Sequence, residues 1–267
     1  MISMLPQGTF KDQVAIITGG GTGLGRAMAL ELARLGACVV IASRNEEHLQ
    51  PTLQELNELG CKAMAVPVDV RDFDRISAMV QQVHLEYGRI DILINNAAGN
   101  FLCPAEKLSA NGWNSVINIV LNGSFYCTRA VAPYMIEQKR GNILSILASY
   151  AWTGGPGTVH SAAAKAGVLA MTRTLAVEWG HYGIRVNAVC PGAVPTPGSS
   201  AALMFEGNPQ AQAKLLKDIP VGHVGTDADI AHAASYLLSD YATFINGEVL
   251  VLDGGQWLGK GYMEYQH

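Results

Sequence analysis

The amino-acid sequence predicts a single α/β domain, residues 1–267, in which helices cover both faces of a doubly wound parallel sheet. Short apolar runs rich in β-branched residues alternate with longer helical patterns along most of the chain. The apolar runs are nearly continuous, which is typical of parallel strands that are buried on both faces. No linker, internal repeat or shift in composition divides the chain. With 49% hydrophobic residues, a chain of this length can bury a large core.

Seven apolar runs are expected to form the strands of this sheet. They are residues 14–18, 38–42, 63–68, 90–94, 142–147, 184–189 and 249–252. The first helical pattern repeats Leu24, Met28 and Leu32 on one face and is expected to end at Gly36. Further helical patterns cover residues 46–59, 72–87, 161–178 and 211–217.

Residues 195–218 are expected to form a mobile element. This segment opens with prolines, a glycine and serines, and a short helical pattern follows. Ligands of open α/β sheets bind beyond the carboxyl ends of the strands, and the segment leaves the sheet at that edge. We therefore expect it to act as a lid over a substrate.

Composition and spacing exclude several classes of protein. The net charge of −4 leaves no basic stripe of the kind that neutralises phosphates, which argues against nucleic acid as the main partner. The five cysteines and seven histidines show no metal-ligand spacing, and the scattered thiols fit a reduced compartment. No apolar stretch is long enough for a membrane span, and residues 1–10 do not resemble a signal peptide. The sequence thus predicts a cytoplasmic protein without a metal site.

A glycine-rich turn follows the first expected strand and opens the first helix. Small residues allow the backbone to approach a pyrophosphate, and the helix offers free N–H groups and the positive end of its dipole. The spacing is TGxxxGxG rather than GxGxxG, but its place between a strand and a helix is the one that dinucleotide binding requires. The residues expected to contact a dinucleotide are Thr18, Gly19, Gly21, Thr22, Gly23, Leu24 and Gly25.

The end of the second expected strand favours NADP over NAD. A site for NAD usually carries an acidic residue there for the ribose hydroxyls, whereas this chain has Ser43 and Arg44. A guanidinium beside a hydroxyl suits a 2′-phosphate, and no carboxylate repels it. The alternative is that Arg44 is a solvated residue at the start of a helix.

The order of these motifs resembles the short-chain dehydrogenase/reductase family. The glycine turn, Asn95-Asn96-Ala97-Ala98-Gly99 after the fourth strand and Pro191-Gly192 after the sixth match that family over essentially the whole chain. The resemblance implies a Rossmann-type sheet of seven strands and a homotetramer. It also implies that Asp69 and Val70 lie near the adenine, that Asn96, Ala97 and Ala98 lie along the cofactor, and that Pro191 and Gly192 lie beside the nicotinamide.

The active-site pattern of that family is altered here. The family pairs a tyrosine with a lysine four residues later, but four residues before Lys165 stands Ser161, and Ala148 replaces the usual serine. A serine hydroxyl is a much poorer acid than a phenol. The combination of Asn100, Tyr150, Ser161 and Lys165 instead resembles the bacterial NADPH-dependent 2,4-dienoyl-CoA reductases within the family, as does the tail 253–257.

This resemblance implies the reduction of an acyl-CoA substrate in the β-oxidation of unsaturated fatty acids. Hydride adds to Cδ of the diene and charge develops on the thioester oxygen, so the site needs donors in the manner of an oxyanion hole. Tyr150 and Asn100 are expected to be these donors. Lys165 is expected to bind the nicotinamide ribose, and Ser161 to orient Lys165 or the nicotinamide. The dienolate then takes a proton at Cα from water, which gives a 3-enoyl product.

Two other functions remain open from the sequence. In the first, Tyr150 takes the vacant tyrosine position, and the protein is a 3-oxoacyl or carbonyl reductase. In the second, the protein binds NADP as a sensor without catalysis. Individually, Tyr150 suits a core or rim position, Asn100 suits a turn, and Lys165 suits a solvated helix. Their joint spacing favours an active site, while His160 is interpreted as a neighbour of that site.

Overall fold

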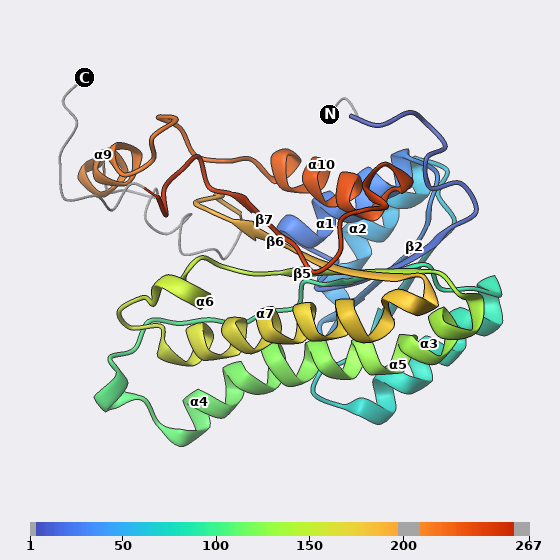
Figure 1. The fold of residues 1–267 in the computed structure, drawn as a ribbon, viewed down its shortest axis with the longest axis horizontal. Helices are drawn as coiled ribbons and strands as arrows, with labels where there is room; N and C mark the ends of the chain where they lie inside the picture. Colours follow the sequence, from blue (N-terminus) through green and yellow to red (C-terminus); the bar gives the residue numbers. More distant parts are fainter. Residues whose placement is uncertain (1–3, 197–208, 259–267) are drawn as a thin grey trace.

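Seven parallel strands form one sheet between two layers of helices (Figure 1). The computed structural model describes residues 4–196 and 209–258. The sheet has the order β3-β2-β1-β4-β5-β6-β7. The strands are β1 Val14–Thr18, β2 Cys38–Ser43, β3 Ala63–Pro67, β4 Ile92–Asn95, β5 Gly141–Ile146, β6 Ile184–Pro191 and β7 Val249–Leu252. The predicted fold class, a parallel seven-stranded sheet with helices on both faces, is therefore confirmed.

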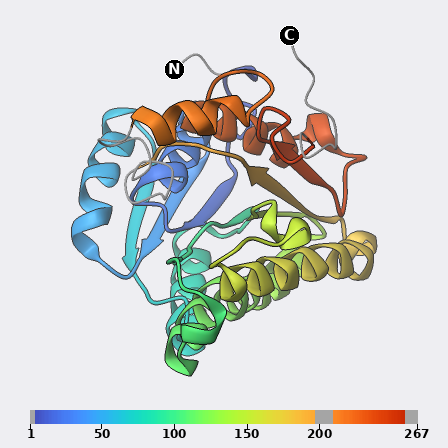
Figure 2. The same cartoon turned by 90° about the vertical axis from the view of Figure 1, so that its left-hand side faces the viewer.

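The helices form two layers that lie on opposite faces of the sheet (Figure 2). One layer contains α1 Gly23–Arg34, α2 Glu46–Glu58 and α10 Asp227–Leu238. The other contains α3 Phe73–Tyr87, α4 Ala110–Ile117, α5 Gly123–Gln138 and α7 Val159–Trp179. Two further helices, α6 Tyr150–Thr153 and α9 Pro209–Lys217, lie at the carboxyl end of the strands, on the left of Figure 1. None of the described helices is long and apolar enough to cross a membrane.

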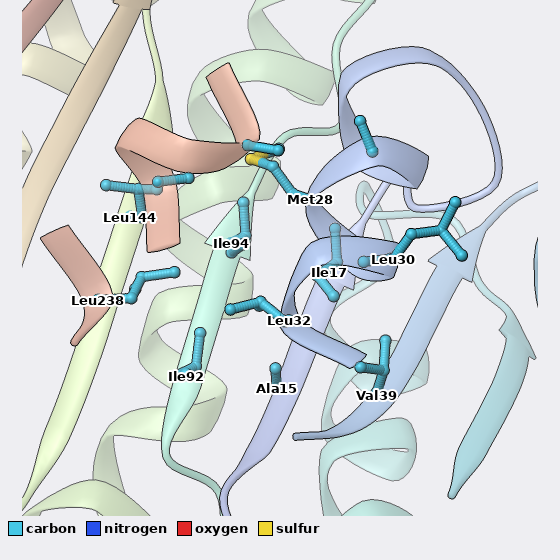
Figure 3. Close-up of a cluster of buried hydrophobic side chains, with 14 of the residues drawn as sticks. Ala15, Ile17, Met28, Leu30, Leu32, Val39, Ile92, Ile94, Leu144 and Leu238 are labelled. Atoms are coloured by element: carbon cyan, nitrogen blue, oxygen red, sulfur yellow. The ribbon is translucent and has the colours of Figure 1, made fainter. Parts of the chain in front are cut away.

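Successive residues of β1 contribute to the cores on opposite faces of the sheet. Ala15 and Ile17 pack with Met28 and Leu32 of α1 (Figure 3), whereas Ile16 belongs to the core beneath α3 and α5. All five side chains are at most 1% exposed. Burial of one such large side chain contributes about 1.5–3 kcal/mol. This two-sided burial explains why the strands are continuous apolar runs in the sequence.

The expected strands and helices form with small differences at their ends. β4 begins at Ile92 because the backbone N–H and C=O of Ile90 are bonded to the side chain of Gln138, at 2.9 and 2.8 Å. β6 extends to Pro191, which pairs with Leu252 of β7. The helices α4, α5 and α10 were not predicted. In α5 the buried positions are largely small or polar residues, so the apolar pattern is weak.

The topology places a ligand crevice at one edge of the sheet. β1 is flanked by β2 and β4. The sheet continues from β2 to β3 on one side of β1 and from β4 to β5, β6 and β7 on the other side. Such a switch point opens a crevice beyond the carboxyl ends of the strands. The residues predicted to form the site follow β1, β2, β3, β4, β5 and β6, so they all gather at this edge.

Candidate active site

The turn after β1 has the backbone geometry of a cradle for an anion. Gly19 and Gly23 have φ of 64° and 51°, a region that suits glycine. A Cβ on Gly25 would lie 2.1 Å from the carbonyl oxygen of Gly19, so only glycine permits this packing. Thr22 precedes α1 without capping it through its side chain, and the first turn of the helix has no acidic residue. Its first N–H groups therefore remain available to a phosphate.

The turn is held in place from both of its sides. The hydroxyl of Thr52 in α2 donates to the carbonyl of Gly21 at 2.9 Å. On the other side, the amide of Asn96 donates to the carbonyls of Thr18 and Gly19 at 3.0 and 3.1 Å. The hydroxyl of Thr18 accepts from the backbone N–H groups of Asn96 and Ala97 at 3.1 and 3.0 Å. Thr18 and Asn96 thus join the ends of β1 and β4, as a rigid cofactor site requires.

A hollow of about 310 Å³ lies beyond the ends of β2 and β3. It is lined by Arg44, Pro67, Val68, Asp69, Asp72 and Arg75. The side chain of Arg71 binds Asp69 with an Nη2–Oδ2 distance of 2.5 Å, and this bond, with a smaller contribution from Arg44, lowers the pKa of Asp69. Ser43, the last residue of β2, lines the adjoining hollow with Arg44. Arg44 is exposed and accessible to a ligand there.

The other residues predicted to contact the cofactor line the same edge. Val70 is buried beneath Gly123, where a Cβ on the glycine would lie 2.7 Å from Val70 Cγ2. Ala98 is exposed just after β4. At the end of β6, Gly192 donates its N–H to Leu252 at 2.8 Å, and a Cβ there would lie 2.5 Å from Asp253 Cβ. Gly192 therefore allows the segments after β6 and β7 to touch.

The structure brings Tyr150 to Ser161. Tyr150 is the first residue of α6, and Ser161 lies in the first turn of α7. Their hydroxyl oxygens are 2.9 Å apart. Ser161 and Lys165 are four residues apart and share one face of α7. The phenol thus lies beside Ser161, the residue that stands where the family has its tyrosine, although Tyr150 comes from another helix.

Burial shifts the pKa values of Lys165 and Tyr150. Lys165 is only 7% exposed and donates to the backbone carbonyl of Ile146. Desolvation lowers the pKa of Lys165 from 10.5 to about 8. Burial also raises the pKa of Tyr150, and the hydrogen bond with Ser161 offsets only part of that increase. Tyr150 therefore remains a neutral donor at neutral pH.

Asn100 is exposed in the loop after β4. Its Oδ1 accepts the N–H of Phe101 at 2.9 Å, and its Nδ2 has no partner among the described residues. The bond orients the amide and leaves its donor end available. The turn role that the sequence left open for Asn100 and a role as donor are thus compatible.

Two further polar groups lie near this site. Asn122 donates to Asn118 at 2.8 Å within a π-helical turn, Asn118–Asn122, a feature that is frequent at functional sites. His160 is fully buried, and its Nδ1 accepts the N–H of Ser161 at 2.8 Å. Its ring packs edge-to-face on Phe101 with the centroids 4.5 Å apart. His160 therefore packs beside the site through Ser161 and Phe101.

Sequence reasoning missed two contacts at the rim of the site. Trp152 of α6 packs edge-to-face on Trp257, which follows β7, with ring centroids 5.8 Å apart. Thr196 lies against the turn after β1, where a Cβ on Gly23 would be 3.3 Å from Thr196 Cβ. No local pattern indicates either contact, because the partners are far apart in the chain. Of the expected lid, 195–218, residues 197–208 lie outside the described part of the chain, and its helix is α9.

No cluster of side chains suited to a metal ion occurs among the described residues.

Comparison with known proteins extends over nearly the whole chain. Residues 19–256 match the family described as enoyl-(acyl carrier protein) reductase. A probable 2,4-dienoyl-CoA reductase of Bacillus subtilis (strain 168), named as (2E)-enoyl-CoA-producing, is 50% identical over 250 residues, which cover 93% of this chain and 98% of that protein. A probable 2,4-dienoyl-CoA reductase of Caenorhabditis elegans, named as (3E)-enoyl-CoA-producing, is 40% identical over 256 residues, or 95% and 83% of the two chains.

A solved structure resembles the fold closely. A short chain dehydrogenase from Bacillus anthracis str. 'Ames Ancestor' superposes with a TM-score of 0.86 and is 50% identical. The match covers 94% of this chain and 99% of that one.

Proposed function

This chain belongs to the short-chain dehydrogenase/reductase family and is an oxidoreductase that uses a nicotinamide dinucleotide, and from that premise we propose that it reduces 2,4-dienoyl-CoA thioesters with NADPH. The observation that carries the proposal is the placement of Tyr150, whose hydroxyl lies 2.9 Å from Ser161 on the face of α7 that bears Lys165. The names of relatives at 40–50% identity support the substrate class.

The chain offers donors where the reaction needs them. When bound, NADPH supplies a hydride, which adds to Cδ of the conjugated acyl group and moves charge onto the thioester oxygen. Tyr150 O–H and Nδ2 of Asn100 stabilise that oxygen, as in an oxyanion hole. Lys165 binds the nicotinamide ribose, and its charge favours Tyr150 as a donor. Ser161 orients Lys165 or the nicotinamide and holds the phenol.

The position of the product double bond depends on which carbon is protonated. We infer that the dienolate takes a proton from water at Cα, which yields a 3-enoyl thioester. Protonation at Cγ would give the 2-enoyl thioester for which the Bacillus subtilis relative is named. The deuterium content of the product, after reaction in D₂O, separates the two outcomes: NMR should find the label at Cα beside a 3,4 double bond, and a label at Cγ would refute this step.

The proposed preference for NADPH is supported by the residues at the end of β2. Arg44 is exposed beside a hollow, and the side chain of the preceding residue, Ser43, is a hydroxyl rather than a carboxylate. A guanidinium there favours the 2′-phosphate of NADPH. The free first turn of α1 would hold the pyrophosphate, and Gly192 would allow close approach at the nicotinamide.

We further propose that the enzyme works as a homotetramer in the cytoplasm and acts in the β-oxidation of unsaturated fatty acids. The tetramer is the common assembly of the family, and the substrate class places the reaction in that pathway.

The test of this function is the oxidation of NADPH with hexadienoyl-CoA and decadienoyl-CoA, with NADH and a 3-oxoacyl thioester as controls. Rapid turnover of a dienoyl substrate that prefers NADPH is expected. Reduction of the 3-oxoacyl thioester alone would favour a ketone reductase in which Tyr150 serves as the proton donor. Tight binding of NADPH without any turnover would favour a sensor.

A further inference from the structure

We infer that Trp152 and Trp257 form an aromatic wall that receives the alkyl tail of the acyl substrate and determines which chain lengths the enzyme accepts. This inference rests on the proposed function and assigns a specificity role to the contact between α6 and the segment after β7. The two indoles meet edge-to-face, with their centroids 5.8 Å apart and their planes at 83°.

The strand order indicates the direction of the bound substrate. The sheet continues β4-β5-β6-β7, and the reacting residues follow these strands in the same order: Asn100 after β4, Tyr150 after β5, and Pro191 with Gly192 at the end of β6. In the proposed reaction Asn100 and Tyr150 would hold the thioester oxygen, and Pro191 and Gly192 would hold the nicotinamide, from which Cδ would receive the hydride. A line from the oxygen through Cδ therefore continues toward the residues that follow β7.

Trp257 stands where that line leaves the reacting centre. It follows β7, and the segment that carries it touches the end of β6, because Gly192 lies against Asp253. Trp152 approaches from the other side, two residues after Tyr150 in α6. The pair thus bridges the two segments that enclose the far end of a dienoyl group.

The turn that carries Trp257 is well held. The carboxylate of Asp253 accepts the N–H groups of Gly255 and Trp257 at 2.9 and 2.8 Å. A Cβ on Gly254 would lie 2.5 Å from Val221 Cγ2, so this glycine packs directly on the segment before α10. These contacts fix the backbone from which the indole projects, so less conformational freedom is lost when a ligand binds.

The wall is apolar and partly open. Trp152 remains 36% exposed, and Leu258, next to Trp257, is 69% exposed. Exposed apolar side chains grouped beside a reacting centre are typical of a ligand site. An alkyl tail would cover this surface, whereas the polar end of the substrate remains on the side of Asn100.

The test compares hexadienoyl-CoA with decadienoyl-CoA in the wild-type enzyme and in Trp257→Ala. Removal of the indole should lower the ratio of kcat/KM for decadienoyl-CoA to that for hexadienoyl-CoA by about tenfold or more, mainly through KM, since apolar pockets discriminate on this scale. Trp257→Phe retains a ring and should retain most of the preference. A matched control is Phe244→Ala, which removes a fully exposed ring that precedes β7 and so lies at the opposite edge of the sheet.

An unchanged ratio of the two kcat/KM values in Trp257→Ala would overturn the inference. If that variant does not fold, Trp152→Ala, which removes the partner indole, should lower the same ratio, and an unchanged ratio there would overturn the inference. Failure of the proposed function has a different signature, because the wild-type enzyme would then reduce neither dienoyl thioester.

Discussion

The turn after β1 and the loops after β4 and β5 lie at the same edge of the sheet but are held in different ways. In the turn, glycines and backbone carbonyls make the decisive contacts, and Thr18, Thr52 and Asn96 fix them through several hydrogen bonds. The reacting side depends on single side-chain contacts, such as the one between Tyr150 and Ser161. In the proposed function, binding of the cofactor thus rests mainly on backbone geometry, whereas the reaction rests on a few side chains that the fold brings together.

This difference predicts that a substitution in the loops after β4 and β5 lowers kcat but leaves the affinity for NADPH unchanged. Tyr150→Phe removes one donor to the thioester oxygen, so kcat for a dienoyl-CoA should fall by about 100- to 1000-fold. The affinity for NADPH, measured by fluorescence titration, should stay within about threefold because the turn after β1 is untouched. Tyr241→Phe at an exposed position serves as the control. An unchanged kcat in Tyr150→Phe would remove the phenol from the mechanism.

A change in the turn after β1 should instead lower both the unfolding free energy and the affinity for NADPH. Gly25→Ala places a Cβ 2.1 Å from the carbonyl oxygen of Gly19, and the overpacking should cost about 1–3 kcal/mol of unfolding free energy. NADPH binding should weaken more than tenfold, about 1.4 kcal/mol. Gly180→Ala is the control: Gly180 has φ of −56°, Gly25 has no positive φ either, and a Cβ on Gly180 would meet only Asn246 Nδ2 at 3.5 Å, an ordinary contact. Urea unfolding and cofactor titration measure both effects, and an equal affinity for NADPH in the two variants would contradict the prediction.

Arg44, which lines the hollow beyond β2, allows a test of a side chain rather than of the backbone. Arg44→Ala should raise KM for NADPH about tenfold and leave KM for NADH nearly unchanged, because a charged hydrogen bond to the 2′-phosphate contributes about 1.5–3 kcal/mol. Arg75 lines the same hollow, so Arg75→Ala controls for a general effect of positive charge. Equal increases of KM for both cofactors in Arg44→Ala would show that Arg44 does not distinguish them.

Lys165 connects the two regions, and its titration has two consequences of opposite sign. Activity requires its charged form, so kcat/KM should fall about tenfold for each pH unit above its pKa of about 8. Lys165→Arg keeps a cation at all these pH values, and its profile should lack this alkaline decline even if its rate is lower. An alkaline decline that persists in Lys165→Arg would assign it to another group.

The stability of the fold should change in the other direction. The folded pKa of Lys165 lies below its ordinary value of 10.5, so the unfolded chain binds the proton more tightly. Below about pH 8 both states are protonated and the fold bears the cost of the buried charge. Between pH 8 and 10.5 that cost is relieved, and the unfolding free energy of the wild type should rise relative to Lys165→Met by up to about 3 kcal/mol. A difference that does not change with pH would mean that Lys165 is not desolvated.

Much of the molecule was predictable from the sequence because the relevant signals are local. Continuous apolar runs indicated a two-sided parallel sheet, since each strand is buried on both faces. The glycine turn was recognisable because the required positive φ at Gly19 and Gly23 and the close contact at Gly25 exclude other residues. The helix α5 was missed, because small residues such as Gly123 and Ser124 pack where apolar side chains would give a pattern.

The sequence by itself therefore determined the sheet, the glycine turn after β1 and the absence of the usual tyrosine before Lys165, all of which depend on neighbouring residues. Only the tertiary structure decided that Tyr150 reaches Ser161, that Oδ1 of Asn100 accepts the N–H of Phe101, and that the two tryptophans meet. These contacts join α6 to α7 and the end of β5 to the end of β7. Such contacts depend on how the strands are ordered and how the segments after them pack, which spacing along the chain does not specify.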